Sequence, residues 1–278
     1  MMISIIVPVF KPGKEFETLV NSLLEQDSKW FEVLIINGGP ITEILNNSIS
    51  RLKANGILCQ FIHEADNGIY DAMNKGIIKS KGEYLYFIGS DDALKGNILK
   101  IICEELLKNK WDMIYGNVWS EFLGGKYNGE YDNLKIQERN ICHQAIFYNR
   151  NVFNLYGGYN TNYIACADWD FNLKLFFNEN VSKKYIDIII AIYGDGGFST
   201  KIQDVAFKND FDNNVLEYGK NVLTNENKYS LKFQRMRHTS FKTNPITKLI
   251  YLVSFLFTSV NNNFLKFNFI YKKSNFKK

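Results

Sequence analysis

Strand-like and helix-like segments alternate through the first 110 residues, and this alternation limits the possible folds more than any other feature of the sequence. Short apolar runs bounded by turn residues predict buried strands, and apolar residues at three- and four-residue spacing predict amphipathic helices. Strands that each precede a helix form a parallel sheet covered by helices on both faces, so the predicted fold class is α/β. The predicted strands are residues 3–9, 33–36, 58–63 and 83–88, and the predicted helices are 15–26, 41–53, 67–80 and 98–108.

Polar and glycine-rich segments follow the ends of these strands. In open α/β sheets, ligands bind in the crevice beyond the carboxyl ends of the strands. We therefore expect one rim of the sheet to collect the chemistry of the protein. The segments that follow the four strands are 8–10, 37–39, 64–66 and 90–92.

Two adjacent carboxylates, Asp91 and Asp92, follow the most aromatic of these strands. Like charges at the mouth of an apolar layer destabilise the fold unless a cation or hydrogen-bond donors compensate them. Magnesium or manganese fits such a pair, because these ions take one or two carboxylates and fill their other positions with water and phosphate oxygens. The alternative is that one of the two carboxylates caps a helix that begins near Ala93.

Several protein classes are excluded or unsupported. A phosphate-binding loop of the GxxxxGK[ST] type is absent, and no GxGxxG follows the first strand, so neither a nucleotide triphosphatase nor a dinucleotide oxidoreductase is indicated. The four cysteines lie far apart without a CxxC pair, which argues against a thiolate zinc site or a disulfide framework. The N-terminus lacks the features of a signal peptide, and we therefore expect a cytoplasmic protein.

Charge is distributed unevenly along the chain. Residues 1–227 contain all 29 acidic residues and 22 of the 33 basic ones, whereas residues 228–278 contain 11 basic residues and no acidic residue. An acidic body with a basic tail indicates an anionic surface as the partner of the tail, either lipid headgroups or nucleic acid.

Four segments stand in this order along the chain: SIIVPVF at 4–10, DNGIYDAMNKGI at 66–77, GSDD at 89–92 and ADWD at 167–170. Together they resemble the family 2 glycosyltransferases with the GT-A fold, and more narrowly their bacterial capsule, exopolysaccharide and O-antigen members. The resemblance implies metal-dependent, inverting transfer of a hexosyl or N-acetylhexosaminyl group from a nucleotide-sugar, most often a UDP-sugar. The implied acceptor is a saccharide or a polyprenyl-linked saccharide of a surface polysaccharide.

The resemblance also assigns the donor site. Asp92 is the expected ligand of a divalent metal, Mn²⁺ or Mg²⁺, and Asp91 is expected to contact the ribose or the sugar. Asn37 departs from the family pattern, which usually has an aspartate that pairs with uracil; an amide can still hydrogen-bond to a pyrimidine. Asp71 has an alternative role. Lys75 lies four residues later on the same face of the predicted helix, so the two side chains can simply form an exposed ion pair. The other expected donor-site residues are Pro8, Val9, Phe10 and Asp66.

Asp168 is the candidate general base that removes the proton of the acceptor hydroxyl. It matches the last aspartate of the family's Glu-Asp motif, with Ala167 in place of the glutamate. Asp170 is the competing carboxylate, and capping of the helix that follows is the alternative role for either aspartate.

The acceptor side is assigned to His143, Gln144 and Trp169, although a purely structural histidine is the alternative for His143. The glycine-rich segment 194–199 resembles the family's flexible loop and predicts either closure over the diphosphate or an ordinary tight turn.

The predicted domains are a GT-A domain at 1–215 and a helical, basic C-terminal region at 216–278. The apolar run 246–260 is shorter than the roughly 20 residues that span a bilayer. With its flanking lysines and aromatic residues it predicts a membrane-surface anchor and a protein bound peripherally to the inner face of the cell membrane. The alternative is a helix that packs on the enzyme.

Two other functions stay open at this point. Asn37 and Ala167 allow a noncatalytic nucleotide-sugar-binding homologue. A nucleic-acid-binding protein is the weaker alternative and is not expected, because no nucleic-acid-binding signature accompanies the basic tail.

Overall fold

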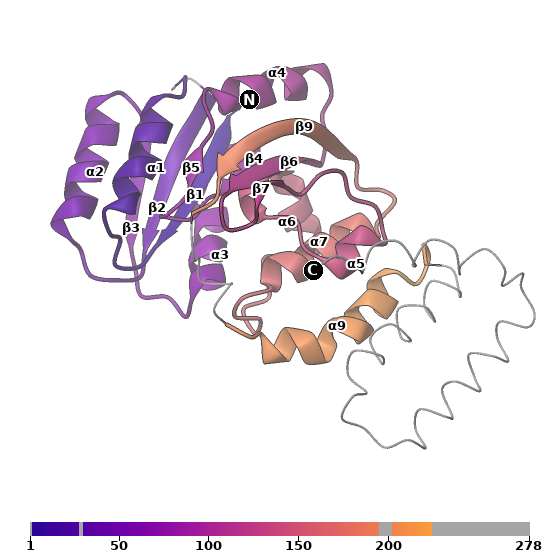
Figure 1. Cartoon of the computed structure of the whole chain (residues 1–278). Helices are drawn as coiled ribbons and strands as arrows, with labels where there is room; N and C mark the ends of the chain where they lie inside the picture. Colours follow the sequence, from indigo (N-terminus) through magenta and orange to yellow (C-terminus); the bar gives the residue numbers. More distant parts are fainter. Residues whose placement is uncertain (1, 28–29, 195–201, 224–278) are drawn as a thin grey trace, which may run out of the picture. The chain divides into compact units, whose positions relative to one another are not determined.

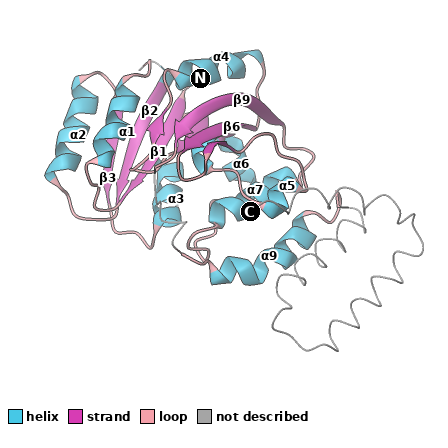
Figure 2. Ribbon diagram, viewed as in Figure 1, coloured by secondary structure: helices cyan, strands magenta, loops and turns pink. Residues whose placement is uncertain are grey.

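The computed structural model describes residues 2–27, 30–194 and 202–223. The chain divides into two compact units, residues 1–221 and 222–278, and the first contains every element considered below. Figure 1 gives their order along the chain, and Figure 2 separates helices from strands by colour. The predicted C-terminal anchor at 246–260 lies outside the described residues. Residue 215, the expected domain boundary, lies inside the last described helix.

The elements alternate as the sequence predicts through residue 108, except that a two-residue strand lies between the fourth strand and the fourth helix. The strands are β1 (Ile3–Val9), β2 (Phe31–Asn37), β3 (Leu58–His63), β4 (Tyr84–Phe87), β5 (Ala93–Leu94), β6 (Met113–Ser120), β7 (Gly125–Tyr127), β8 (Ile146–Asn149) and β9 (Lys183–Ile192). The helices are α1 (Glu15–Leu24), α2 (Glu43–Ala54), α3 (Ile69–Lys79), α4 (Ile98–Lys108), α5 (Lys135–Glu138), the 3₁₀ helix η2 (His143–Ala145), α6 (Arg150–Tyr156), α7 (Ala167–Phe176) and α9 (Val205–Tyr218).

The strands form one mixed sheet in the order β3-β2-β1-β4-β8-β6-β9-β5, with β7 paired to β6. The first four strands in this order are parallel, as predicted. Strand β8 runs antiparallel to both β4 and β6, and β9 runs parallel to β6. Every residue of β1 and β2 is buried, so both faces of the sheet are covered at its centre.

One expectation about the segment after Asp92 is wrong. Ala93 does not begin a helix: Ala93 and Leu94 form the short strand β5, which pairs with the end of β9 about a hundred residues later. Helix α4 begins at Ile98, and its N-cap residue is Asn97. Neither Asp91 nor Asp92 therefore caps a helix, because a distant strand determines the conformation of the residues that follow them.

Packing between α3 and the sheet depends on a residue without a side chain. A β-carbon placed on Gly76 lies 2.3 Å from Cγ2 of Ile6 on β1, far inside van der Waals contact. Helix α3 therefore lies closer to the sheet than any larger residue at position 76 allows.

None of the helices in the described ranges combines the length and the apolar character needed to cross a membrane.

We predict that Gly76→Ala lowers the free energy of unfolding by about 1–3 kcal/mol, because the added methyl group overpacks the interface with Ile6. Urea denaturation measures the change. Asn47→Ala on the exposed face of α2 is the matched control, with an expected change within about 0.5 kcal/mol. Equal stability of Gly76→Ala and wild type contradicts the close approach of α3.

Candidate active site

The carboxyl ends of β1 and β2 and the loop after β3 meet at one rim, as predicted. Phe10 is the exposed residue of the 8–10 segment, whereas Pro8 and Val9 are buried in β1. A β-carbon on Gly39 lies 3.1 Å from the Phe10 ring, and one on Gly38 lies 1.7 Å from a carboxylate oxygen of Asp66. The two glycines therefore allow Phe10 and Asp66 to lie directly on the turn after β2.

Asn37 is fully buried at this rim. Its Nδ2 donates to the carbonyl of Gly39 at 2.8 Å and lies 3.1 Å from Nδ1 of His63, and its Oδ1 accepts from the Gly39 N–H at 3.2 Å. The amide thus closes the turn after β2 and contacts β3. Recognition of a base by Asn37 stays a prediction.

Asp66 and Asp71 organise the start of α3. Oδ1 of Asp66 accepts from the Gly68 N–H at 3.0 Å, and Oδ2 of Asp71 accepts from the Asn67 N–H at 2.9 Å. Asp71 also forms the ion pair with Lys75, at 3.3 Å, that the sequence left as its alternative role. A contact of either aspartate with the donor stays a prediction.

Asp92 is buried, with 2% of its surface exposed. Its Oδ2 accepts from the Gly89 N–H at 3.0 Å and from Nε2 of Gln144 at 2.8 Å, and its Oδ1 accepts from the Gly194 N–H at 2.9 Å. Burial raises the pKa of Asp92 and the neighbouring charge of Asp91 adds to the rise, whereas the donors from Gly194 and Gln144 oppose it.

The residues at this corner fit a divalent cation. Asp91 is partly exposed, and no hydrogen bond reaches its carboxylate from the part of the chain that the structure describes. A β-carbon on Gly89 lies 2.7 Å from Oδ2 of Asp92 and 2.9 Å from Oδ1 of Asp91, so the two carboxylates converge beside this glycine. No group of three or more His, Cys, Asp or Glu side chains suited to a metal occurs within the described ranges. A cation here therefore requires oxygens from a ligand as well.

Asp168 lies in the first turn of α7 and is 7% exposed. Its Oδ1 accepts from the Tyr70 hydroxyl at 2.7 Å and from the Trp169 N–H at 2.9 Å, and its Oδ2 accepts from Nδ2 of Asn140 at 2.9 Å. The N-cap residue of α7 is Cys166, so neither Asp168 nor Asp170 is the cap. The capping alternative for these aspartates is wrong.

The 3₁₀ helix η2 joins the two buried carboxylates. Gln144 donates to Asp92, and Nδ1 of His143, one residue earlier, lies 3.5 Å from Oδ2 of Asp168. Burial raises the pKa of the adjacent Cys142 to about 12, and the charges of Asp168 and Asp92 both contribute to the rise. The structure therefore brings together Asp92, His143, Gln144 and Asp168.

Asp170 and Trp169 point to other partners. Asp170 forms an ion pair with Lys174 at 2.9 Å and accepts from Asn214 and Tyr218 of α9. Trp169 donates its indole N–H to the carbonyl of Ile136 at 2.7 Å, and its ring contacts Phe207 and Phe211 of α9. Both side chains thus attach α7 to its neighbours. A role of Trp169 on the acceptor side stays a prediction.

Sequence reasoning missed three of the donors to the carboxylates, namely Tyr70, Asn140 and Gly194. Tyr70 lies inside a segment that was assigned to the donor site, and Asn140 carries no local signal at all. Gly194 begins the glycine-rich segment, which was the one available indication of its role: a β-carbon at this position lies 2.4 Å from the carbonyl oxygen of Asp91. Residues 195–199 of that segment lie outside the described residues.

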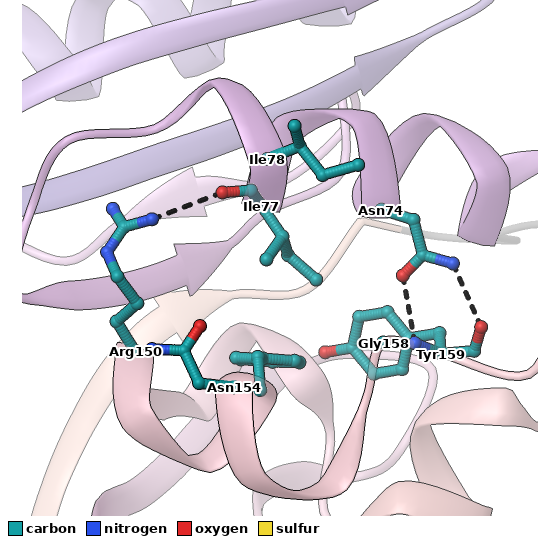
Figure 3. A pocket seen from close by; sticks show the side chains of 8 residues that line it. Asn74, Ile77, Ile78, Arg150, Asn154, Gly158 and Tyr159 are labelled. Carbon is teal, nitrogen blue, oxygen red and sulfur yellow. Dashed lines mark hydrogen bonds between the residues drawn. The ribbon is translucent and has the colours of Figure 1, made fainter.

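A cavity of about 490 Å³ lies between α3 and α6, and none of the predicted site residues lines it (Figure 3). Its walls include Ile77, Ile78, Arg150 and Tyr159. The Arg150 guanidinium is already used in hydrogen bonds to the carbonyls of Gly82 and Ile77. The candidate active site is therefore the corner around Asp92 and Asp168.

Comparison with known proteins agrees with this fold. Residues 4–169 match the family described as Glycosyl transferase family 2. A PGL/p-HBAD biosynthesis glycosyltransferase of Mycobacterium tuberculosis is 34% identical over 212 residues, which cover 74% of this chain and 82% of the relative. The chondroitin synthase of Pasteurella multocida is 26% identical over 220 residues, or 76% of this chain and 22% of the synthase.

Solved structures show the same fold at low identity. TarS of S. aureus, residues 1–349 in complex with UDP-GlcNAc, has a TM-score of 0.68 at 17% identity over 89% of this chain and 78% of that one. The mannosyltransferase PcManGT of Pyrobaculum calidifontis, in complex with GDP-Man and Mn²⁺, has a TM-score of 0.57 at 11% identity over 94% and 76%. The fold is that of the GT-A glycosyltransferases. The chain belongs to glycosyltransferase family 2.

The raised pKa of Asp92 predicts a pH-dependent stability. Between the ordinary value of 3.8 and the higher folded value, the folded state holds a proton that the unfolded state has released. The contribution of Asp92 to the free energy of unfolding is therefore greatest below 3.8 and is lost as pH rises through the folded value.

Denaturant unfolding of wild type and Asp92→Asn across this pH range, with a chelator present, measures the effect. Asparagine does not titrate, so we expect wild type to lose stability relative to Asp92→Asn as pH rises. A stability difference that stays constant with pH contradicts the assigned environment of Asp92.

Proposed function

We propose that this glycosyltransferase moves a hexosyl or N-acetylhexosaminyl group, with inversion, from a nucleotide-sugar to a saccharide acceptor. The observation that carries the proposal is the link through η2: Gln144 contacts Asp92, and His143 lies beside Asp168. One short segment thereby holds a diphosphate-side carboxylate and an acceptor-side carboxylate in fixed relation. Such pre-organisation is what transfer between two bound substrates requires.

Asp92 is the residue that would hold a divalent metal, Mn²⁺ or Mg²⁺, and Asp91, which lies beside it at Gly89, would contact the ribose or the sugar. A bound metal supplies positive charge that stabilises the departing diphosphate. The protein's own part is to keep the Asp92 carboxylate oriented through Gly89, Gln144 and Gly194. The solved neighbour with GDP-Man and Mn²⁺ supports this proposal through its fold.

Asp168 acts as the general base in the proposed reaction. The acceptor oxygen bonds to the anomeric carbon while its proton passes to the Asp168 carboxylate, and the bond from the anomeric carbon to the diphosphate breaks with its electron pair on the phosphate oxygen. The hydrogen bonds from Tyr70, Asn140 and Trp169 hold this carboxylate in place.

The donor lies along the rim after β1, β2 and β3 in this proposal. Phe10 offers an exposed ring for a base, and Pro8, Val9, Asn37, Asp66 and Asp71 line or support the same rim. UDP is the proposed nucleotide, since the neighbour of known structure with UDP-GlcNAc shares the fold.

We further propose that the acceptor is a saccharide or a lipid-linked saccharide of bacterial surface polysaccharide, and that the basic tail holds the enzyme at the inner membrane face. The support is the 11 basic residues without an acidic one after residue 227. Anionic lipid attracts such a segment by about 1 kcal/mol for each basic residue near the surface.

The donor and metal site is tested by thermal unfolding with UDP, with and without Mn²⁺. A ligand at 100 times its Kd stabilises the folded state by about 2.7 kcal/mol. We expect Mn²⁺ to increase the stabilisation by UDP in wild type and to have no such effect in Asp92→Asn. Asp187→Asn, which changes an exposed carboxylate on β9, is the control and should respond as wild type does. A full manganese response in Asp92→Asn refutes the assignment.

The base is tested by Asp168→Asn, which should lower kcat by about 10²–10⁴-fold because the amide accepts no proton. Stabilisation by UDP should be unchanged. Asp170→Asn is the neighbouring control: it should lose stability with its Lys174 ion pair and keep most of its kcat. Stabilisation of wild type by UDP without transfer to any acceptor would instead favour a noncatalytic homologue.

A further inference from the structure

Two side chains of α3 reach the segments around the proposed base. The Tyr70 hydroxyl donates to Oδ1 of Asp168 at 2.7 Å, across 98 positions of sequence. Asn74, one turn later, pairs with the backbone of Tyr159: its Oδ1 accepts the N–H at 2.8 Å and its Nδ2 donates to the carbonyl at 2.9 Å (Figure 3). Helix α3 therefore contacts both the base and the loop that leads to it.

The two carboxylate oxygens of Asp168 differ in how many further hydrogen bonds they can accept. A carboxylate oxygen offers about two lone-pair positions. Oδ1 accepts from the Tyr70 hydroxyl and from the Trp169 N–H, so both of its positions are filled. Oδ2 accepts only from Asn140 among the hydrogen bonds of the described residues, and its other close neighbour is Nδ1 of His143 at 3.5 Å. Oδ2 is thus the oxygen with room for a further proton donor.

A second chain of hydrogen bonds fixes Asn140. Its Oδ1 accepts from Nδ2 of Asn172 at 2.9 Å, and Oδ1 of Asn172 accepts from the Tyr148 hydroxyl at 2.7 Å. These two hydrogen bonds determine which end of the Asn140 amide faces Asp168. The carboxylate is therefore held from both sides, by Tyr70 at Oδ1 and by Asn140 at Oδ2.

The loop between α6 and α7 is held at both ends. Asn74 holds Tyr159, and the approach is close enough that a β-carbon on Gly158 lies 2.5 Å from Oδ1 of Asn74. At the other end, Oδ2 of Asp204 accepts the N–H groups of Ala165 at 2.8 Å and Cys166 at 3.0 Å. The first turn of α7, which carries Asp168, therefore begins from a fixed point.

We propose that α3 positions the base: Tyr70 fills Oδ1 of Asp168, so that Oδ2 alone receives the proton of the acceptor hydroxyl, and Asn74 fixes the loop that sets the start of α7. This inference rests on the proposed function. Tyr70 and Asn74 are positioning residues, since each acts through another group. The motif around Tyr70 thus serves the acceptor side of the reaction as well as the donor rim.

Tyr70→Phe tests the proposal by separating kcat from KM. The variant keeps the ring and removes one hydroxyl, so Oδ1 of Asp168 keeps only the Trp169 N–H and has room for a second donor. We expect kcat to fall by about 10- to 100-fold, because displacement of a catalytic group slows the chemical step. The KM for the nucleotide-sugar should stay within about twofold of wild type. A purely structural role predicts no such separation. Asn74→Ala is the second variant and should show the same pattern.

Tyr84→Phe is the matched control. It removes another buried hydroxyl, which donates to the carbonyl of Trp111 at 2.9 Å from the opposite end of β4, and it should leave kcat and KM unchanged. Wild-type kcat in Tyr70→Phe, or a rise in KM that accounts for the whole loss, overturns the inference.

Asp168→Asn separates this inference from the proposed function. Full transfer by Asp168→Asn refutes the role of Asp168 as the base, and with it this inference, but leaves the proposed glycosyl transfer in place. An inactive Asp168→Asn beside a fully active Tyr70→Phe overturns the role of α3 alone.

Discussion

The burial of two carboxylates is the constraint on which the rest of the structure depends. Asp92 and Asp168 are 2% and 7% exposed, and a buried charge is tolerated only when hydrogen-bond donors replace the lost water. Those donors come from separate parts of the chain: Gln144 and Gly194 for Asp92, Tyr70 and Asn140 for Asp168. The site therefore forms only when segments far apart in the sequence have come together.

The antiparallel direction of strand β8 explains why one short segment, η2, contacts both Asp92 and Asp168. Because β8 runs opposite to β4, its first residue lies beside the end of β4, where Asp91 and Asp92 follow. The preceding helix η2 is thereby held at the same corner, and the Tyr86 hydroxyl donates to the carbonyl of Gln144 at 2.8 Å. Helix α7, which carries Asp168, packs against α6 through the stacked rings of Phe153 and Phe171, whose centroids lie 4.6 Å apart.

Much of the fold could be predicted because its first half is built from local patterns. Strand β3 and helix α4 have the predicted limits, since strongly periodic segments define their own faces. The alternative in which Asp91 or Asp92 caps a helix that begins near Ala93 was wrong because β5 has only two residues and depends on β9 for its conformation. Two residues carry no periodic signal, and their partner lies about a hundred positions away.

The sequence by itself determined the alternation of strands and helices and the candidate site residues Asp92, His143, Gln144 and Asp168. The alternation and the place of Asp92 follow from hydrophobic periodicity and from the rule that ligands lie beyond the carboxyl ends of parallel strands, whereas His143, Gln144 and Asp168 were indicated by the family resemblance. Only the tertiary structure decided which donors serve each carboxylate, and that Asp170 attaches α9 and lies apart from the site. The reason is physical: a hydrogen bond such as that from Tyr70 to Asp168 depends on distance in space, and pairing across a mixed sheet is invisible to any local pattern.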